Sequence, residues 1–445
     1  MVRRAVIPAI AALAAALLVA APAGATISSP KRISPSNLRI QGVAVGAGGG
    51  RTAIVMDGYD PKPSPDRFEV LARLGTATSL GAAQRLAGSG YVTGVAVGAD
   101  GTAVAGWTQT INGKRTWRVA IARPGKSFGS ARTLGDSGVF NGVLAVTPKG
   151  RIVAIWRTRT SDHGVRVAIA PPGGWFGGAR TIGVARQNQP LLVTSGPDGT
   201  VVATWLDAPT APPPPAWIQA TTLPPSASAF AAPTTLASLT YWGSGGPALS
   251  AGPGGVVVSW PQTSAAGVRE LVRVLPDGTF ASPIDLTTSA PIAGIGLENK
   301  LALGLPSDRS INALWQDART KTAENPELTS SVVKTSTRPA AGGRFSAPRT
   351  LSTSGWLAGG PEADALTGRT IAAWGETAKT RPSRLRIAIR SNGSWTVASP
   401  LKAPDLDTGS VSLAAGGRHV PVIWIQHPDA ERQRGQAYLA TYRPS

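Results

Sequence analysis

Short hydrophobic segments separated by turns recur along the chain in a fixed order. The clearest copy, Val95–Trp107, places small apolar residues on either side of a turn at Asp100–Gly101 and ends in tryptophan. Other copies are Leu144–Trp156, Thr194–Trp205 and segments that end at Trp260, Trp315, Trp374 and Trp424. An earlier copy, Thr52–Asp57, carries Asp57 where the others have tryptophan. The chain therefore contains eight units, spaced 49 to 59 residues apart.

Each unit predicts four short antiparallel strands. The first two flank a turn whose glycine can adopt the positive φ of a tight hairpin. A β-rich third strand follows a variable loop, as at Arg118–Ala122, and a fourth strand follows a second turn, as at Ser130–Leu134. Beyond residue 25, no stretch of ten or more residues has a convincing helical period.

Four antiparallel strands repeated in tandem are typical of the blades of a β-propeller. A single blade cannot bury both of its faces, so blades stack around a central axis, and the recurring tryptophan is expected to pack between them. The sequence thus predicts one all-β domain over residues 26–445 with about eight four-stranded blades. Seven blades remain the alternative if the irregular sixth unit, around Leu301–Leu305, is an insertion.

The two ends of the predicted domain complement each other. The eighth unit has a third strand near residues 437–442, after which the chain ends without a fourth strand. Near the other end, Ile27–Ser34 matches the fourth-strand segment Phe345–Ser352 in its pattern of residues. We therefore expect the N-terminal strand to complete the last blade and to close the ring, hiding an open sheet edge.

Residues 1–25 have the features of a secretory signal peptide. Arg3 and Arg4 precede the apolar run Ala5–Ala20, which is shorter than the ~20 residues of a spanning helix. Small residues at Ala21–Ala25 suit cleavage after Ala25. The mature protein is expected to be secreted, either extracellular or associated with the cell wall, and no later segment is apolar enough to cross a membrane.

Composition excludes several classes of chemistry. The 445 residues contain no cysteine, which removes disulfides, thiol catalysis and thiolate metal sites. The three histidines lack metal-ligand spacing, so neither a metal site nor a cofactor is expected. The net charge of +20 favours anionic partners such as cell-wall polymers or acidic glycans. Compositional bias, with an excess of arginine over lysine, explains the charge equally well, and no specific nucleic-acid partner is indicated.

In this architecture the chain resembles secreted bacterial β-propeller repeat proteins, broadly of the sialidase-like and lectin-like kind. The resemblance covers nearly all of residues 27–445, but it rests only on the recurring residue pattern of the strands. The Asp-box motif of sialidases is absent, and Ser391–Trp395 resembles it only weakly. The resemblance therefore implies a propeller in which a face could bind carbohydrate, and it supplies no catalytic residue.

A candidate binding face follows from the order of the strands. Loops between the second and third strands open on the same side of a propeller as the connections between blades. The former loops carry arginines and the latter carry aromatic residues, and an aromatic ring beside a guanidinium suits a sugar ring with an anionic substituent. The candidate ligand-binding residues are Tyr91, Phe140, Tyr241, Trp242, Trp356, Arg157, Arg159, Arg319, Arg381 and Arg384.

These residues also have structural explanations, because the aromatics could pack at blade junctions and the arginines could form a solvated rim. The favoured hypothesis is a monomeric, non-catalytic binding protein for a glycan or anionic polymer. One alternative is a sialidase-like glycan hydrolase using Asp207, Asp317 or Glu376, since paired carboxylates ~5–9 Å apart can perform glycosidic acid–base chemistry. A third possibility is a scaffold for protein partners at the cell surface.

Overall fold

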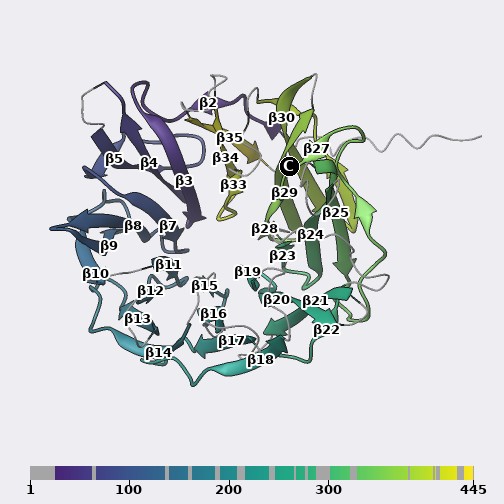
Figure 1. Ribbon diagram of the computed structural model, residues 1–445, viewed down its shortest axis with the longest axis horizontal. Coiled ribbons are helices and arrows are strands. Elements are labelled where there is room, and N and C mark those ends of the chain that lie inside the picture. The colour runs from purple at the N-terminus through teal and green to yellow at the C-terminus, as the bar shows by residue number, and fades with distance from the viewer. Residues whose placement is uncertain are drawn as a thin grey trace, which may run out of the picture.

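The computed structural model shows a ring of eight antiparallel blades around a central axis (Figure 1). It describes residues 26–443, leaving out residues 63–66, 136–139, 159–162, 186–190, 208–215, 240–245, 265–266, 276–278, 287–300, 321–327, 379–380, 404–405, 407–410 and 428–434. The predicted signal peptide, residues 1–25, lies outside the described residues. All regular structure in the described part is β-strand. The prediction of an eight-bladed all-β propeller is confirmed, and the sixth unit is a blade of its own.

The first four blades each contain four strands in chain order, from the innermost to the outermost. Blade 1 comprises β3 (Arg39–Gly48), β4 (Arg51–Asp60), β5 (Arg67–Gly75) and β6 (Gln84–Ala87). Blade 2 comprises β7 (Tyr91–Val97), β8 (Ala103–Ile111), β9 (Lys114–Ala122) and β10 (Arg132–Gly135). Blade 3 comprises β11 (Phe140–Val146), β12 (Ile152–Arg157), β13 (Gly164–Ala170) and β14 (Arg180–Val184). Blade 4 comprises β15 (Leu191–Ser195), β16 (Val201–Asp207), β17 (Ala216–Leu223) and β18 (Thr234–Leu239).

The remaining blades keep this order, with some positions filled by two short strands. Blade 5 comprises β19 (Ala248–Gly252), β20 (Gly255–Ser264), β21 (Gly267–Leu275) and β22 (Ile284–Asp285). Blade 6 comprises β23 (Leu301–Gly304), β24 (Ile311–Thr320), β25 (Leu328–Arg338) and β26 (Arg349–Thr350). Blade 7 has β27 (Leu357–Ala358) and β28 (Glu362–Leu366) innermost, then β29 (Arg369–Ala378) and β30 (Arg381–Ser391), then β31 (Ser394–Val397) and β32 (Leu401–Lys402). Blade 8 comprises β33 (Ser412–Leu413), β34 (Val420–Gln426), β35 (Gln436–Arg443) and, outermost, β1 (Thr26–Ile27) and β2 (Lys31–Arg32).

The N-terminal segment completes the last blade, as expected from the sequence. Thr26 and Ile27 pair with Arg443 and Tyr442, and β2 pairs with the same strand further along. Between the two short strands, the Ser28 amide donates to the Thr441 carbonyl, and the Ser28 hydroxyl accepts from the Thr441 amide, both at 2.9 Å. The polar groups along this edge of β35 are thereby paired within the chain.

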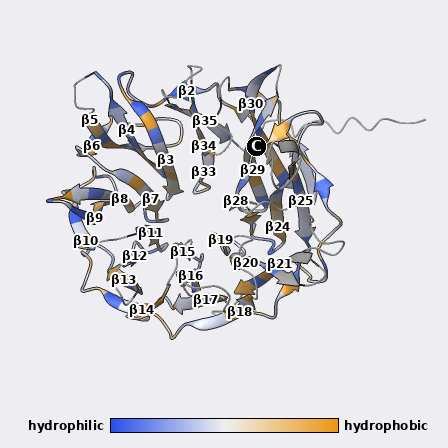
Figure 2. Cartoon of the chain, viewed as in Figure 1, coloured by the Kyte–Doolittle hydropathy of each residue, from blue (hydrophilic) through white to orange (hydrophobic). Residues whose placement is uncertain are grey.

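The recurring tryptophans lie between blades, where the repeat predicted them. All seven are at most 8% exposed. Each packs against the preceding blade: Trp156, for example, lies in a cluster with Val104, Val119 and Ile121 of blade 2. Hydrophilic segments lie instead on outermost strands such as β10 and β14 (Figure 2). The tryptophan repeat therefore marks the blade-to-blade core.

Asp57 does not occupy the tryptophan position of blade 1, contrary to the sequence alignment. Gly58 pairs with Ile40 beside a bulge, just as Trp107 pairs with Val92 beside the bulge of blade 2. The hairpin of blade 1 closes over two residues, whereas the hairpin of blade 2 encloses five between Val97 and Ala103. This difference shifts the register by one residue, and a one-residue shift turns a side chain to the other face of the sheet.

Candidate functional site

The two ends of the ring carry different connections. Hairpins between the first and second strands of each blade form one end, which we call the hairpin face. The loops between second and third strands and the connections between blades form the other end, which we call the loop face. Tyr91, at the start of β7, and Thr108 pair near the loop face, while Val97 and Ala103 pair near the hairpin face. The predicted binding residues that the structure describes belong to the loop face.

An aromatic cluster lies on the loop face at the junction of blades 1 and 2. Arg39 pairs with Tyr59, and Tyr59 pairs with Phe68, so these three residues are neighbours across three strands. The ring of Phe68 lies 5.5 Å from that of Tyr59 and 6.3 Å from that of Tyr91, centroid to centroid. The guanidinium of Arg39 lies 5.6 Å from the Tyr59 centroid. The cluster therefore combines a row of rings with one cation.

Tyr91 is the exposed member of this cluster. Its side chain is 54% exposed, and among the described residues it is the one large hydrophobic side chain that is exposed. Phe68 and Tyr59 are half-buried beneath and beside it. A solvent-exposed aromatic ring that is fixed by contact with a second ring can stack against another molecule.

Asp57 lies buried below the aromatic cluster. Its Oδ1 accepts a hydrogen bond from the Val92 amide at 2.9 Å, which ties blade 1 to the residue that follows Tyr91. A side chain at Gly42 would place its Cβ 2.5 Å from the same oxygen, so glycine is required there. Burial raises the pKa of Asp57 to about 6, and hydrogen bonds from the backbone partly oppose this rise.

The raised pKa of Asp57 predicts a stability that depends on pH. The folded state holds the proton more tightly than the unfolded chain, so this group contributes most below pH 4 and its contribution is lost as pH rises through about 6. A shift of about two pKa units corresponds to roughly 3 kcal/mol. Asp57→Asn keeps an oxygen for the Val92 amide and removes the charge. Urea unfolding at pH 4.5 and 8 should show the variant gaining stability relative to the parent at the higher pH, and parallel curves would contradict this account.

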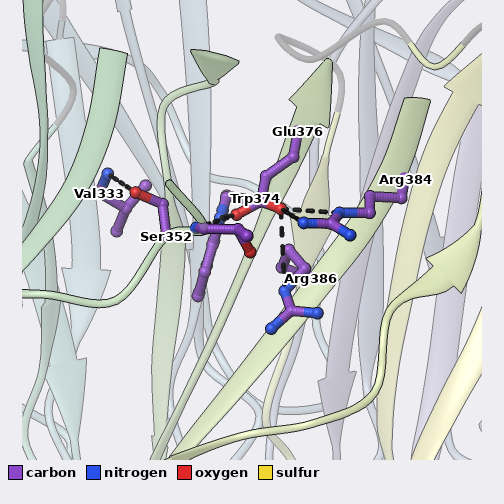
Figure 3. Close-up of polar contacts among 7 residues, drawn as sticks. Val333, Ser352, Trp374, Glu376, Arg384 and Arg386 are labelled. Carbon is purple, nitrogen blue, oxygen red and sulfur yellow. Dashed lines mark hydrogen bonds and ion pairs between the residues drawn. The ribbon is translucent and has the colours of Figure 1, made fainter. Parts of the chain in front are cut away.

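A second set of predicted residues meets on blade 7, around Glu376 (Figure 3). Glu376 is fully buried, and its Oε1 accepts hydrogen bonds from the Thr353 amide at 2.8 Å and from Trp374 Nε1 at 3.3 Å. Its Oε2 pairs with Arg384 at 2.7 Å, and Arg386 Nε lies 3.9 Å away. Both oxygens of this carboxylate therefore accept hydrogen bonds from donors within the fold.

Trp356 belongs to the same arrangement. The Arg384 guanidinium lies 3.7 Å from the Trp356 ring centroid, and that of Arg381 lies 5.9 Å away. Trp356 itself is only 8% exposed, so one of its faces is covered by Arg384 while the residue packs into the blade. Arg381 is exposed. The structure thus brings Trp356, Arg381 and Arg384 together, with Arg381 as the accessible member.

The other predicted residues are distributed around the ring. Arg157 is buried at the end of β12, where its backbone pairs with Phe140, and it has an interaction partner. Arg319 lies near the end of β24 in blade 6. Arg159, Tyr241 and Trp242 lie outside the described residues. Of the described candidates, the structure therefore brings together Trp356, Arg381 and Arg384 on blade 7, while Tyr91, Phe140, Arg157 and Arg319 lie apart from them on blades 2, 3 and 6.

The carboxylates proposed for catalysis are engaged. Asp317 forms an ion pair with Lys334, and Asp207 also has an interaction partner. Glu376 is enclosed as described above. In the part of the chain that the structure describes, no group of three or more metal-ligating side chains comes together.

Sequence reasoning overlooked Arg39 and Phe68 as members of the aromatic cluster. Their positions in the repeat could have indicated them. Arg39 begins the first strand of blade 1, and Phe68 lies at the start of the third strand, after the loop that follows Tyr59. The sequence also gave no sign that Arg51 joins two blades. Its guanidinium donates to the Gly101 carbonyl at 2.9 Å and to the Arg123 carbonyl at 2.7 Å. Some of the positive charge is therefore used to hold blades together.

Comparisons with known proteins identify the architecture. No protein-family model and no curated protein sequence matches the chain. Polysaccharide lyase Uly1 is similar in structure, with a TM-score of 0.50 and 10% identity over 91% of this chain and 90% of that one. The β-propeller domain of the Trilobed protease from Pyrococcus furiosus has a TM-score of 0.45 and 7% identity, covering 83% and 100% of the two chains. A protein of unknown function from Dyadobacter fermentans has a TM-score of 0.45 and 9% identity, covering 95% and 100%.

The described residues contain no helix with the length and apolar character needed to span a membrane.

The blade topology and the similarity to Uly1 agree on one conclusion. This chain is a β-propeller protein.

Proposed function

We propose that the protein is a secreted, non-catalytic binding protein for a glycan or an anionic extracellular polymer, and that it binds through the loop face. The observation that carries this proposal is the exposed ring of Tyr91, supported from below by Phe68. A signal peptide at residues 1–25 would deliver the protein to the compartment where such polymers occur.

The chemistry of the loop face suits a sugar with an acidic substituent. The apolar face of a sugar ring can stack on Tyr91, while a carboxylate or sulfate can accept hydrogen bonds from a guanidinium. Arg39 stands in the Tyr91 cluster, and Arg381 is exposed on the same face at blade 7. A long polymer could contact both groups, because they lie on different blades of one rim.

One further observation supports binding over hydrolysis. The carboxylates expected to act in catalysis have partners within the fold, and a general acid or nucleophile must be able to reach its substrate. The similarity to a polysaccharide lyase indicates that this architecture can serve polysaccharides. At 10% identity, no residue of that enzyme is carried over to this chain.

We expect Tyr91→Ala to weaken polymer binding about tenfold, a loss of ~1.4 kcal/mol, because a stacking surface is removed from a folded rim. Binding of the mature protein to immobilised polygalacturonate, hyaluronate and a neutral glucan would be measured at 50 and 200 mM NaCl. Affinity for the acidic polymers should fall as salt rises, since exposed charges are screened over ~8–10 Å.

Phe176→Ala is the matched control, since Phe176 is a half-buried aromatic residue in a turn on the hairpin face, next to Trp175. It should leave binding unchanged. Binding that survives Tyr91→Ala and is insensitive to salt would remove the loop face from consideration. Release of shortened products from any polymer would favour the hydrolase alternative.

A further inference from the structure

The innermost strands enclose a cavity of about 1110 Å³ that opens at the hairpin face. Its lining comes from blades 1, 2, 3, 4, 5, 7 and 8, including the ends of β3, β7 and β28. A volume of this size accommodates a ligand of several hundred daltons. The cavity lies at the opposite end of the ring from Tyr91, so it is separate from the proposed polymer site.

Glycines contribute to the cavity wall and let neighbouring blades approach closely. A Cβ at Gly48 would lie 2.5 Å from the Gly98 carbonyl oxygen, and one at Gly252 would lie 2.3 Å from the Leu305 carbonyl oxygen. A Cβ at Gly416 would lie 2.1 Å from the Ala47 carbonyl carbon. Larger residues would push the innermost strands apart, so the small residues fix both the width and the shape of the mouth.

The charged side chains of the lining gather on the wall formed by blades 7 and 8. Arg369 begins β29, Arg418 lies in the hairpin between β33 and β34, and Arg443 ends β35. Arg369 hydrogen-bonds the Tyr442 side chain, which anchors it. The side chains of Arg418 and Arg443 are exposed and form no hydrogen bond or ion pair within the described part of the chain.

Acidic groups nearby do not neutralise these arginines. Asp364 also lines the cavity, but its two oxygens accept hydrogen bonds from the Ala365 amide at 2.7 Å and the Ala415 amide at 2.6 Å. The hairpin carboxylates of other blades cap their own turns: Asp100 binds Thr102, and Asp198 binds Thr200. Among the described lining residues, three arginines thus stand beside a single carboxylate, Asp364, whose oxygens are already engaged by backbone amides.

We infer that this cavity binds a small, multiply charged anion, whose carboxylate or phosphate oxygens are held by Arg418 and Arg443 with Arg369 beside them. Guanidinium groups present several donors in a plane and match both carboxylate and phosphate oxygens. Two or more anionic groups on one ligand would engage Arg418 and Arg443 of blade 8 together with Arg369 of blade 7. The small and apolar residues of the remaining wall would enclose the uncharged part of the ligand.

The test is isothermal titration of the full mature chain with citrate and with pyrophosphate, at constant ionic strength. Saturable binding of one molecule per chain is expected, and preference for one probe identifies the ligand as a carboxylate or a phosphate. In Arg418→Gln/Arg443→Gln the affinity should fall about 10- to 100-fold, a total loss of ~1.4–2.8 kcal/mol, because the charge-assisted hydrogen bonds to the anion are removed.

The matched control is Arg344→Gln/Arg349→Gln, which removes the same charge from exposed positions of blade 6 outside the cavity lining. It should change the affinity by less than about twofold, because only the overall electrostatic field of the protein is altered. Tyr91→Ala should also leave this affinity unchanged, which separates the cavity from the loop face. Equal losses in both double variants, or no saturable binding of either probe, would overturn the inference.

Discussion

Replacing Trp205 with alanine is expected to lower the free energy of unfolding by about 3–5 kcal/mol. Trp205 is 1% exposed and packs into a cluster with Val153, Val165 and Leu191, most of it from the preceding blade. Its Nε1 donates to the Val184 carbonyl at 2.8 Å. Truncation leaves a cavity between two stacked sheets and an unpaired carbonyl, and the surrounding strands are held in register by both blades and cannot collapse into the space.

The control for this substitution is Trp175→Ala on the neighbouring blade. Trp175 is half-buried at the margin of the core between blades 2 and 3, and it contacts Phe176 and the guanidinium of Arg132, 4.5 Å from its ring centroid. Its loss should cost less than that of Trp205, about 1–2 kcal/mol, because solvent can fill the space that a half-buried ring leaves. Urea denaturation of the two variants would compare them directly. If Trp205→Ala left the stability unchanged and abolished ligand binding, Trp205 would belong to a binding site and not to the core.

Deletion of residues 26–37 is expected to cause aggregation or a marked fall in melting temperature. The deletion removes β1, β2 and the buried Ile33, whose amide donates to the Ala437 carbonyl at 2.9 Å. Each backbone hydrogen bond contributes roughly 1 kcal/mol, and several are lost together. The edge of β35 then becomes available for pairing with another chain. Differential scanning calorimetry and light scattering would measure both effects.

A matched control separates the backbone from the side chains of this segment. Lys31→Ser/Arg32→Ser keeps the ladder with β35 and alters two exposed side chains. It should melt within a few degrees of the parent and stay monodisperse. If the truncated protein were as soluble and as heat-stable as this control, closure by the N-terminal segment would not be what stabilises the ring.

The sequence was most informative where structure depends on local repetition. A tryptophan every 49 to 59 residues and a glycine turn in each unit are local signals, and each blade reproduces them. The matching of Ile27–Ser34 with Phe345–Ser352 was sufficient to predict closure. The position of Asp57 was mistaken because hairpin length decides which face a residue occupies, and composition alone does not reveal that length.

The candidate site was harder to predict, because it depends on contacts between blades. Tyr91 was recognised as an aromatic residue after a fourth strand, but its support by Phe68 needs the distance between two different blades. Trp356 looked equivalent to Tyr91 in the repeat, yet Arg384 covers it. Likewise, Arg151 was one more basic residue in the sequence, and in the fold it donates to the Ala227 carbonyl of the next blade at 2.9 Å. Neighbouring blades decide which side chains remain accessible.

The direction of the closing strands also determines how the ring responds to mechanical load. Because β1 runs antiparallel to β35, Thr26 stands opposite Arg443 at one end of their ladder. A force that separates these two residues acts along the hydrogen bonds between the strands and breaks them one after another, starting at this end of the ladder. Pulling along the strands would instead shear the whole ladder at once. Traction applied at Thr26 and Arg443 would thus peel β1 from blade 8 at low force, before any tryptophan-packed contact between blades gives way.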